Sequence, residues 1–181
     1  MKLSRKEFDR LALAHMDMLY RLARRLTRDA TSAEDLVQET YVRALRGSDG
    51  FDLQEFGIRP WLVRIMQNLH FSRRQREKRQ PTAMDDEYLE TAQLPETAPY
   101  ALTPGASRDQ MDQRLAKALD DLPDDYKTIL LLWAVEEMSY KEIAVAANVP
   151  IGTVMSRLHR ARQRLSEKLQ DFARKEGIIR E

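Results

Sequence analysis

The chain lacks cysteine altogether, and this absence removes several classes of protein from consideration. With no Cys among 181 residues, a disulfide-stabilised scaffold, a thiolate metal site and a cysteine nucleophile are excluded. Histidine is scarce as well. His15, His70 and His159 lie far apart in the sequence, so a histidine metal site would need long-range convergence. We therefore expect neither a metal nor another cofactor.

Long apolar runs and a large excess of one charge are also missing. No stretch approaches the roughly 20 apolar residues of a membrane-spanning helix, and the N-terminus shows no signal peptide. These absences predict a soluble, cytoplasmic protein. Thirty Lys and Arg against 29 Asp and Glu leave a net charge of +1, which indicates no partner. The apolar share of 43% is enough for packed cores and too high for a disordered chain.

The charge is unevenly distributed along the chain. Residues 1–80 hold 17 bases and 11 acids, which gives +6, whereas residues 108–181 hold 13 of each. Between them, residues 81–107 hold five acids, no base and four of the seven prolines. This composition is typical of a linker. We interpret the chain as two small domains joined by a flexible acidic linker; the alternative is a long surface loop within one domain.

Helical spacing of apolar residues dominates both outer segments, and strand signals are weak, so the fold is predicted to be all-α. In the N-terminal segment the spacing predicts helices over residues 11–26, 33–45 and 60–69. Thr31 and Glu34 fit a capping box at the start of the second helix. Pro60 suits the first turn of the third helix, because its missing N–H would be unpaired there anyway.

The C-terminal segment contains the pattern of a helix-turn-helix. Ser139 and Glu142 fit a second capping box, and Asn148 suits a left-handed helix exit. A long helix is then predicted from about Gly152 to Glu176. Its outward positions combine polar groups with arginines, as a reader of the DNA major groove requires. On these residues alone, a plain helical hairpin with a solvated basic face remains open.

Two further surfaces carry charge. Residues 64–79 contain six bases against Glu77, with Trp61 and Phe71 nearby, and cations with aromatics suit phosphates and unstacked bases. A solvated helix end is the alternative. In the helix after Ala33, the apolar stripe leaves Asp35, Gln38, Glu39 and Arg43 on the other side, where they are indistinguishable from ordinary surface.

Two long motifs nevertheless resemble those of a known family. The helix Asp35–Leu45 is similar to the helix of bacterial sigma factors that binds core RNA polymerase. The segment from Leu122 through Arg162 is similar to their C-terminal promoter-reading domain. The length and the two-domain layout resemble the extracytoplasmic-function (ECF) group. The resemblance implies a sigma factor that binds core polymerase and directs promoter-specific transcription initiation.

The resemblance also implies where the partners bind. The clamp of the largest polymerase subunit is expected to contact Asp35, Gln38, Glu39, Tyr41 and Leu45. The −10 promoter element is expected at Arg64, Asn68, Ser72, Arg73 and Arg74. The −35 element is expected at Tyr140, Lys141, Thr153, Met155, Ser156, Arg157, His159, Arg160 and Arg164. The loop from Gly47 to Ile58 matches a base-capturing loop, with Phe51 or Phe56 as candidates. An anti-sigma factor is a further expected partner.

Two other interpretations compete with the sigma factor. A stand-alone helix-turn-helix regulator would use residues 1–80 for dimerisation or effector binding and would bind DNA without polymerase. A helical hydrolase or nuclease would need a catalytic constellation, but the sequence has no metal-ligand spacing, nucleophile motif or glycine-rich phosphate loop. We therefore expect no enzymatic activity.

Overall fold

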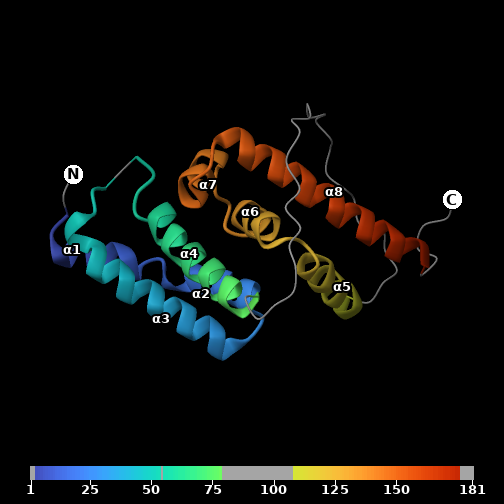
Figure 1. The fold of residues 1–181 in the computed structure, drawn as a ribbon, viewed down its shortest axis with the longest axis horizontal. Helices are drawn as coiled ribbons and strands as arrows, with labels where there is room; N and C mark the ends of the chain where they lie inside the picture. Colours follow the sequence, from blue (N-terminus) through green and yellow to red (C-terminus); the bar gives the residue numbers. More distant parts are fainter. Residues whose placement is uncertain (1–2, 54, 79–107, 176–181) are drawn as a thin grey trace.

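The computed structural model describes residues 3–53, 55–78 and 108–175. Across these residues the chain forms helices and no strand, which confirms the all-α prediction (Figure 1). The N-terminal half contains α1 (Arg5–Leu13), α2 (Met16–Thr27), α3 (Ala30–Gly47), a 3₁₀ turn (Ser48–Gly50) and α4 (Arg59–Lys78). The C-terminal half contains α5 (Arg108–Asp120), α6 (Asp124–Ala134), α7 (Tyr140–Ala147) and α8 (Ile151–Lys175).

The N-terminal helices begin at different residues from those predicted. The apolar spacing over residues 11–26 spans two helices, because the chain turns at Ala14 and His15 between α1 and α2. The predicted capping box of Thr31 and Glu34 is wrong. Asp29 caps α3 instead, its carboxylate accepting from the Ser32 N–H at 2.7 Å. The cap falls there because Arg28 adopts a left-handed conformation that ends α2.

The C-terminal helices follow the prediction closely. Ser139 and Glu142 form the expected capping box at the start of α7. Asn148 ends that helix with a φ of 56°, a conformation that asparagine tolerates better than most residues. After Val149 and Pro150 the chain enters α8, and α7 and α8 pack together as a helix-turn-helix.

A cluster of aromatic rings fixes the loop before α4. Phe8 of α1 meets Phe51 and Trp61 edge-on, with ring centroids 5.7 and 5.8 Å apart, and Phe51 lies 4.7 Å from Trp61. Phe51 is only 7% exposed. The Phe51 ring thus belongs to the core in this conformation, and the role of Phe51 or Phe56 in base capture stays a prediction.

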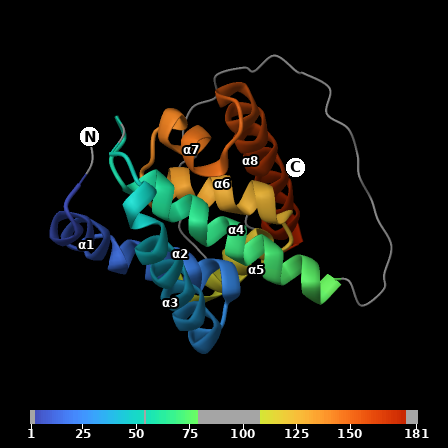
Figure 2. The same cartoon turned by 60° about the vertical axis from the view of Figure 1, so that its left-hand side comes forward.

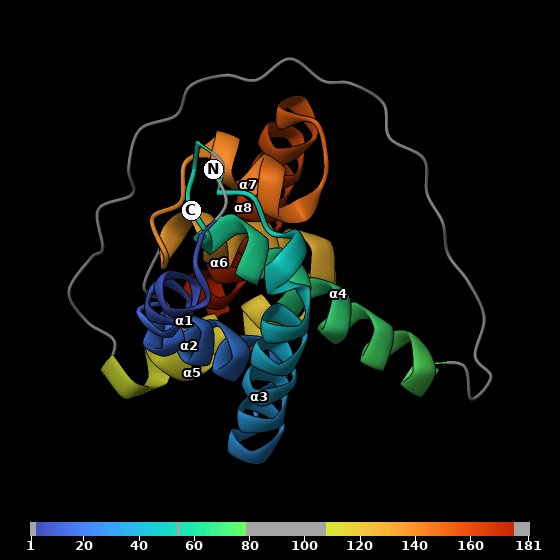
Figure 3. The same ribbon diagram turned by 90° about the vertical axis from the view of Figure 1, so that its left-hand side faces the viewer.

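The two halves pack directly against each other. Helix α4 lies against α7, and α2 touches α6 (Figures 2 and 3). One hydrophobic cluster runs through both halves, from Leu22 and Met66 on one side to Leu132 and Ile143 on the other. The predicted linker, residues 81–107, lies outside the described residues. The direct packing is the main feature that composition and periodicity did not indicate.

Candidate functional site

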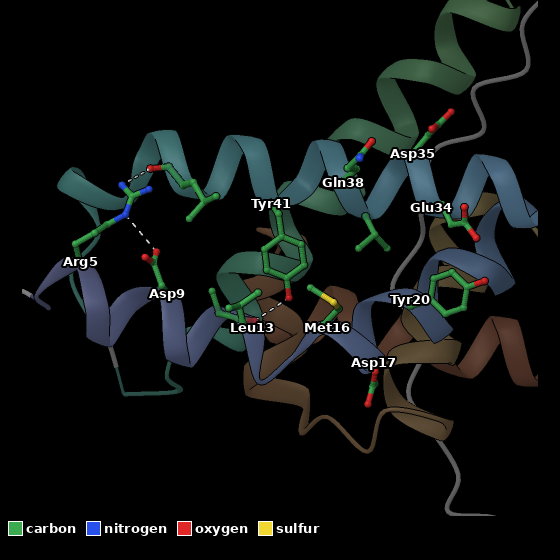
Figure 4. A pocket seen from close by; sticks show the side chains of 13 residues that line it. Arg5, Asp9, Leu13, Met16, Asp17, Tyr20, Glu34, Asp35, Gln38 and Tyr41 are labelled. Carbon is green, nitrogen blue, oxygen red and sulfur yellow. Dashed lines mark hydrogen bonds and ion pairs between the residues drawn. The ribbon is translucent and has the colours of Figure 1, made fainter.

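A groove runs between α3 on one side and α1 and α2 on the other (Figure 4). Its volume is about 760 Å³. Leu13 and Met16 are 55% and 43% exposed there, which is unusual for large apolar side chains in one place. Four carboxylates also line the groove, from Asp9, Asp17, Glu34 and Asp35, and that of Asp9 is paired with Arg5 at 3.2 Å. The groove is therefore suited to a partner with an apolar ridge and basic flanks.

Four of the five residues predicted to bind polymerase line this groove. They are Asp35, Gln38, Tyr41 and Leu45. Glu39 is turned toward α4 instead, where it accepts from Arg73 at 2.7 Å and from Arg43 at 2.9 Å. The hydrogen bond from Arg73, more than the one from Arg43, lowers the pKa of Glu39. Glu39 thus links α3 to α4 rather than facing the groove.

Tyr41 forms a rigid part of the groove wall. Its hydroxyl donates to the carbonyl of Ala12 at 2.8 Å, which ties α3 to α1 (Figure 4). Burial raises the pKa of Tyr41 to about 12, with a smaller contribution from the negative charge of Asp17. Both effects favour the neutral phenol at physiological pH.

Sequence reasoning missed the contribution of α1 and α2 to this groove. Leu13, Met16 and Tyr20 lie off the apolar stripe that predicted these helices, and all three are exposed. Apolar side chains on the polar face of an amphipathic helix were the signal that could have indicated a binding surface on α1 and α2. The break between α1 and α2 decided that these side chains share one groove with α3, and the periodicity did not predict that break.

The predicted DNA-binding face of α4 divides into exposed and engaged side chains. Asn68 and Ser72 are exposed. Arg64 donates to the Val145 carbonyl at 2.6 and 3.1 Å. Arg74 pairs with Asp124 at 3.3 Å, and Arg73 pairs with Glu39. The three arginines are therefore held by other parts of the same chain.

The helix-turn-helix presents the start of α8 to solvent. Val154, Leu158 and Ala161 are buried against the rest of the half. Met155 is 39% exposed, and Lys141 on α7 is exposed too. The other predicted DNA contacts at this end are half-buried: Tyr140, Thr153, Ser156, His159 and Arg160. Tyr140 begins α7, whereas the other four lie in the first turns of α8, the part of the second helix that reads base edges in such motifs.

Three arginines of α8 pack against α6. Arg157 pairs with Asp125 at 3.1 Å. The guanidinium of Arg162 lies 5.3 Å from the Trp133 ring centre, and that of Arg164 lies 5.2 Å from the Tyr126 ring. These distances suit cation–π contacts. Arg157 and Arg164, both predicted to contact DNA, hold α8 on α6 in this conformation.

Other kinds of site find no support in the part of the chain that the structure describes. Its His, Asp and Glu side chains form no group that could hold a metal ion. None of its helices combines the length and the apolar character needed to cross a bilayer.

Comparison with known proteins identifies the family. Residues 11–80 match the family described as Sigma-70 region 2, and residues 112–165 match Sigma-70, region 4. The ECF RNA polymerase sigma factor SigW of Bacillus subtilis is 30% identical over 169 residues, covering 87% of this chain and 86% of that protein. The chain belongs to the ECF sigma factors. SigE of Mycolicibacterium smegmatis is 35% identical over 167 residues, covering 90% of this chain, and the match spans 61% of that relative's length.

Two solved structures have the same fold. The sigma factor RpoE of Bartonella quintana, solved with the anti-sigma factor NepR, matches with a TM-score of 0.68 and 29% identity. That match covers 91% of this chain and 98% of RpoE. CnrH, solved with the cytosolic domain of CnrY, matches with a TM-score of 0.63 and 24% identity, which shows a shared fold. The sigma factor described here thus has a transcription-initiation function, and the stand-alone regulator is not favoured.

Proposed function

We propose that this sigma factor docks on core RNA polymerase through the groove between α3 and the α1–α2 pair. The observation that carries the proposal is the exposed apolar floor of Leu13 and Met16 in a groove that Asp17, Glu34 and Asp35 also line. The partner would be the clamp of the largest polymerase subunit, with basic side chains around an apolar ridge. Asp35 and Gln38 would fix the position of the partner in the groove, while Tyr41 and Leu45 would form the wall of the groove. Glu39 would support it through Arg73 on α4.

Promoter DNA would be bound by two separate faces. On α4, Asn68 and Ser72 would meet the −10 element, with Arg64, Arg73 and Arg74 supplying cations. An amide offers a donor and an acceptor to an unpaired base. On the helix-turn-helix, the −35 element would meet Tyr140, Lys141, Thr153, Met155, Ser156, His159 and Arg160. Arg157 and Arg164 would reach phosphates from the side of α8.

The protein would act in the cytoplasm as a binding subunit, with the chemistry left to polymerase. An anti-sigma factor is the expected regulator, since RpoE and CnrH were each solved with a second protein. The domain limits 1–80, 81–107 and 108–181 remain our proposal for the division of these roles. The matched regions, 11–80 and 112–165, lie within the first and the last of these domains and support the division.

The decisive experiment is reconstitution with purified core polymerase. The wild-type chain should co-elute with core polymerase in gel filtration. It should also direct run-off transcription from a subset of promoters in a genomic template library. Core polymerase alone and the chain alone serve as controls. If the chain binds DNA fragments but never co-elutes with polymerase, the docking proposal fails and a DNA-binding protein independent of polymerase takes its place.

A further inference from the structure

The first turns of α8 expose two large apolar side chains. Ile151 is 43% exposed and Met155 is 39% exposed. Residues four positions apart lie about 40° apart around a helix, so the two side chains form one ridge. Neither belongs to the hydrophobic cluster of the described core, to which Val154 and Leu158 of the same helix contribute. The Ile151–Met155 ridge is therefore available to a partner.

Gly152 follows Ile151, and nothing inside the described part of the molecule requires a glycine there. A Cβ added at Gly152 would meet no atom within 4 Å. The backbone at this position is helical and not left-handed, so an L side chain would fit, and alanine would favour the helix more than glycine does. A glycine that neither packing nor conformation requires is suited to close approach by the backbone of another molecule.

The start of α8 is held in a fixed conformation. The Pro150 carbonyl accepts from the Val154 N–H at 3.2 Å, and the pyrrolidine ring restricts the φ of Pro150. The N–H of Val149 donates to the Ala144 carbonyl at 3.1 Å, which ties the turn back to α7. The Ile151–Met155 ridge is therefore presented by an ordered turn, and binding to it would cost little further ordering of the chain.

Polar groups around the ridge favour nucleic acid over a purely apolar partner. Thr153 and Ser156 neighbour it in the sequence, and Lys141 is exposed on α7. The N-terminal residues of the second helix of a helix-turn-helix lie against base edges in the major groove. The apolar group that a base edge presents there is the 5-methyl group of thymine. A thymine methyl group is therefore the ligand chemistry that fits the ridge.

We propose that Ile151 and Met155 select thymine in the −35 element by contact with its 5-methyl group. Gly152 lets the DNA backbone approach closely enough for this contact. The inference rests on the proposed placement of the −35 element on the helix-turn-helix. It adds Ile151 and Gly152 to that face and names the base that the apolar positions read. Arg160 would read a different base, guanine, through hydrogen bonds.

The test first removes the methyl group from the DNA. The full chain is combined with core polymerase, and the promoter found by run-off transcription is synthesised with uracil in place of single thymines of the −35 element, on either strand. Uracil pairs as thymine does but lacks the 5-methyl group. Affinity of the holoenzyme for each promoter is measured by competition binding. The wild type should bind about fourfold more weakly for each contacted thymine that is replaced, because burial of one methyl-sized group contributes about 0.8 kcal/mol.

The same contact is then removed from the protein. Ile151→Ser with Met155→Gln should abolish the preference, so that thymine and uracil promoters bind alike. Glutamine keeps the length and the helix propensity of methionine, and circular dichroism checks the fold. The matched control is Leu115→Gln, which changes an apolar side chain that is 37% exposed on α5. This control should keep the fourfold preference.

Gly152→Ala separates close approach from helix stability. The Tm should stay constant or rise, because alanine is the better helix former. Affinity for the thymine promoter should nevertheless fall, and the thymine preference should shrink. Gly50→Ala is the control, because a Cβ added at Gly50 also meets no atom within 4 Å and Gly50 lies in the 3₁₀ turn of the other half. Wild-type binding by Gly152→Ala would show that close approach at this glycine is wrong.

Equal affinity of the wild-type holoenzyme for thymine and uracil promoters would overturn the proposal, as would a −35 element without thymine on either strand. A preference that survives the double variant would assign the methyl contact to other residues and would also overturn it. Equal weakening of the double variant on both promoters would place a different partner on the ridge. Failure of the proposed function is distinct, because the wild-type chain would then form no holoenzyme and would transcribe from neither promoter.

Discussion

The groove beside α3 and the arginine face of α4 belong to the same half of the molecule. They differ in whether their polar side chains are exposed to solvent or bonded to the other half. Asp35 and Gln38 are exposed on the groove (Figure 4), whereas Arg64 and Arg74 are engaged by the C-terminal half. A surface that is already exposed can meet its partner without rearrangement. A surface filled by its own chain binds only after a conformational change, and its apparent affinity falls accordingly. We therefore expect polymerase to bind before promoter DNA.

The largest expected effect comes from changing the charge of the exposed groove. Asp35→Arg with Gln38→Arg places cations where a basic partner docks, and like charges in an interface cost several kcal/mol. We expect core polymerase binding to fall by at least about a hundredfold, with loss of run-off transcription, because about 2.8 kcal/mol corresponds to that factor. Affinity is measured by fluorescence anisotropy of the labelled sigma factor.

Asp49→Arg is the control for this variant, because Asp49 is an exposed acid in the 3₁₀ turn outside the groove. It should retain normal polymerase binding. Equal losses in the control and the groove variant would mean that total charge, rather than the groove, governs docking.

The recognition helix provides the next test. Arg160→Ala should remove paired hydrogen bonds to a guanine edge, worth about 1–3 kcal/mol of discrimination. Base preference at one or two positions of the −35 element should relax, as measured by binding to a library of promoter variants. Arg164→Ala should lower affinity evenly across the library, because Arg164 lies over Tyr126 and at most reaches phosphate. If Arg160→Ala and the wild type show the same base preference, Arg160 does not read a guanine of the −35 element.

Asn68 tests the exposed part of the α4 face. Asn68→Ala should leave polymerase binding intact and slow formation of the open complex about fivefold, since the loss of one hydrogen bond costs about 1 kcal/mol. Permanganate footprinting over time measures the melted bases. Gln75→Ala is the control, because Gln75 is exposed on the same helix and has no proposed DNA contact. Normal melting in the Asn68 variant would indicate that its amide is ordinary surface.

The smallest effect is expected inside the groove wall. Tyr41→Phe removes the hydrogen bond to the Ala12 carbonyl and should lower the free energy of unfolding by about 1 kcal/mol. The folded pKa of Tyr41 is raised from 10.0 to about 12. The stabilisation is therefore complete below about pH 10 and is lost as the pH rises toward 12. The difference in Tm between wild type and Tyr41→Phe should shrink over that range; a constant difference would contradict this pKa.

Sequence reasoning located most of the fold because its signals were local. The Ser139–Glu142 capping box and Asn148 set the limits of α7 through contacts within a few residues. The incorrect cap on α3 was a local ambiguity. Thr31 and Asp29 are both good caps, and the left-handed turn at Arg28 decided between them.

The sequence by itself determined the helical class, the helix-turn-helix and the α3 motif that resembles sigma factors, because periodicity, capping and motif spacing act over short stretches. Only the tertiary structure decided that Leu13 and Met16 join Asp35 in one groove. It alone decided that Glu39 faces Arg73 and that Arg64 reaches Val145. Those contacts join residues 34 and 81 positions apart. Which helices meet depends on the packing of the whole core, and helical periodicity specifies only the face of each helix that is buried.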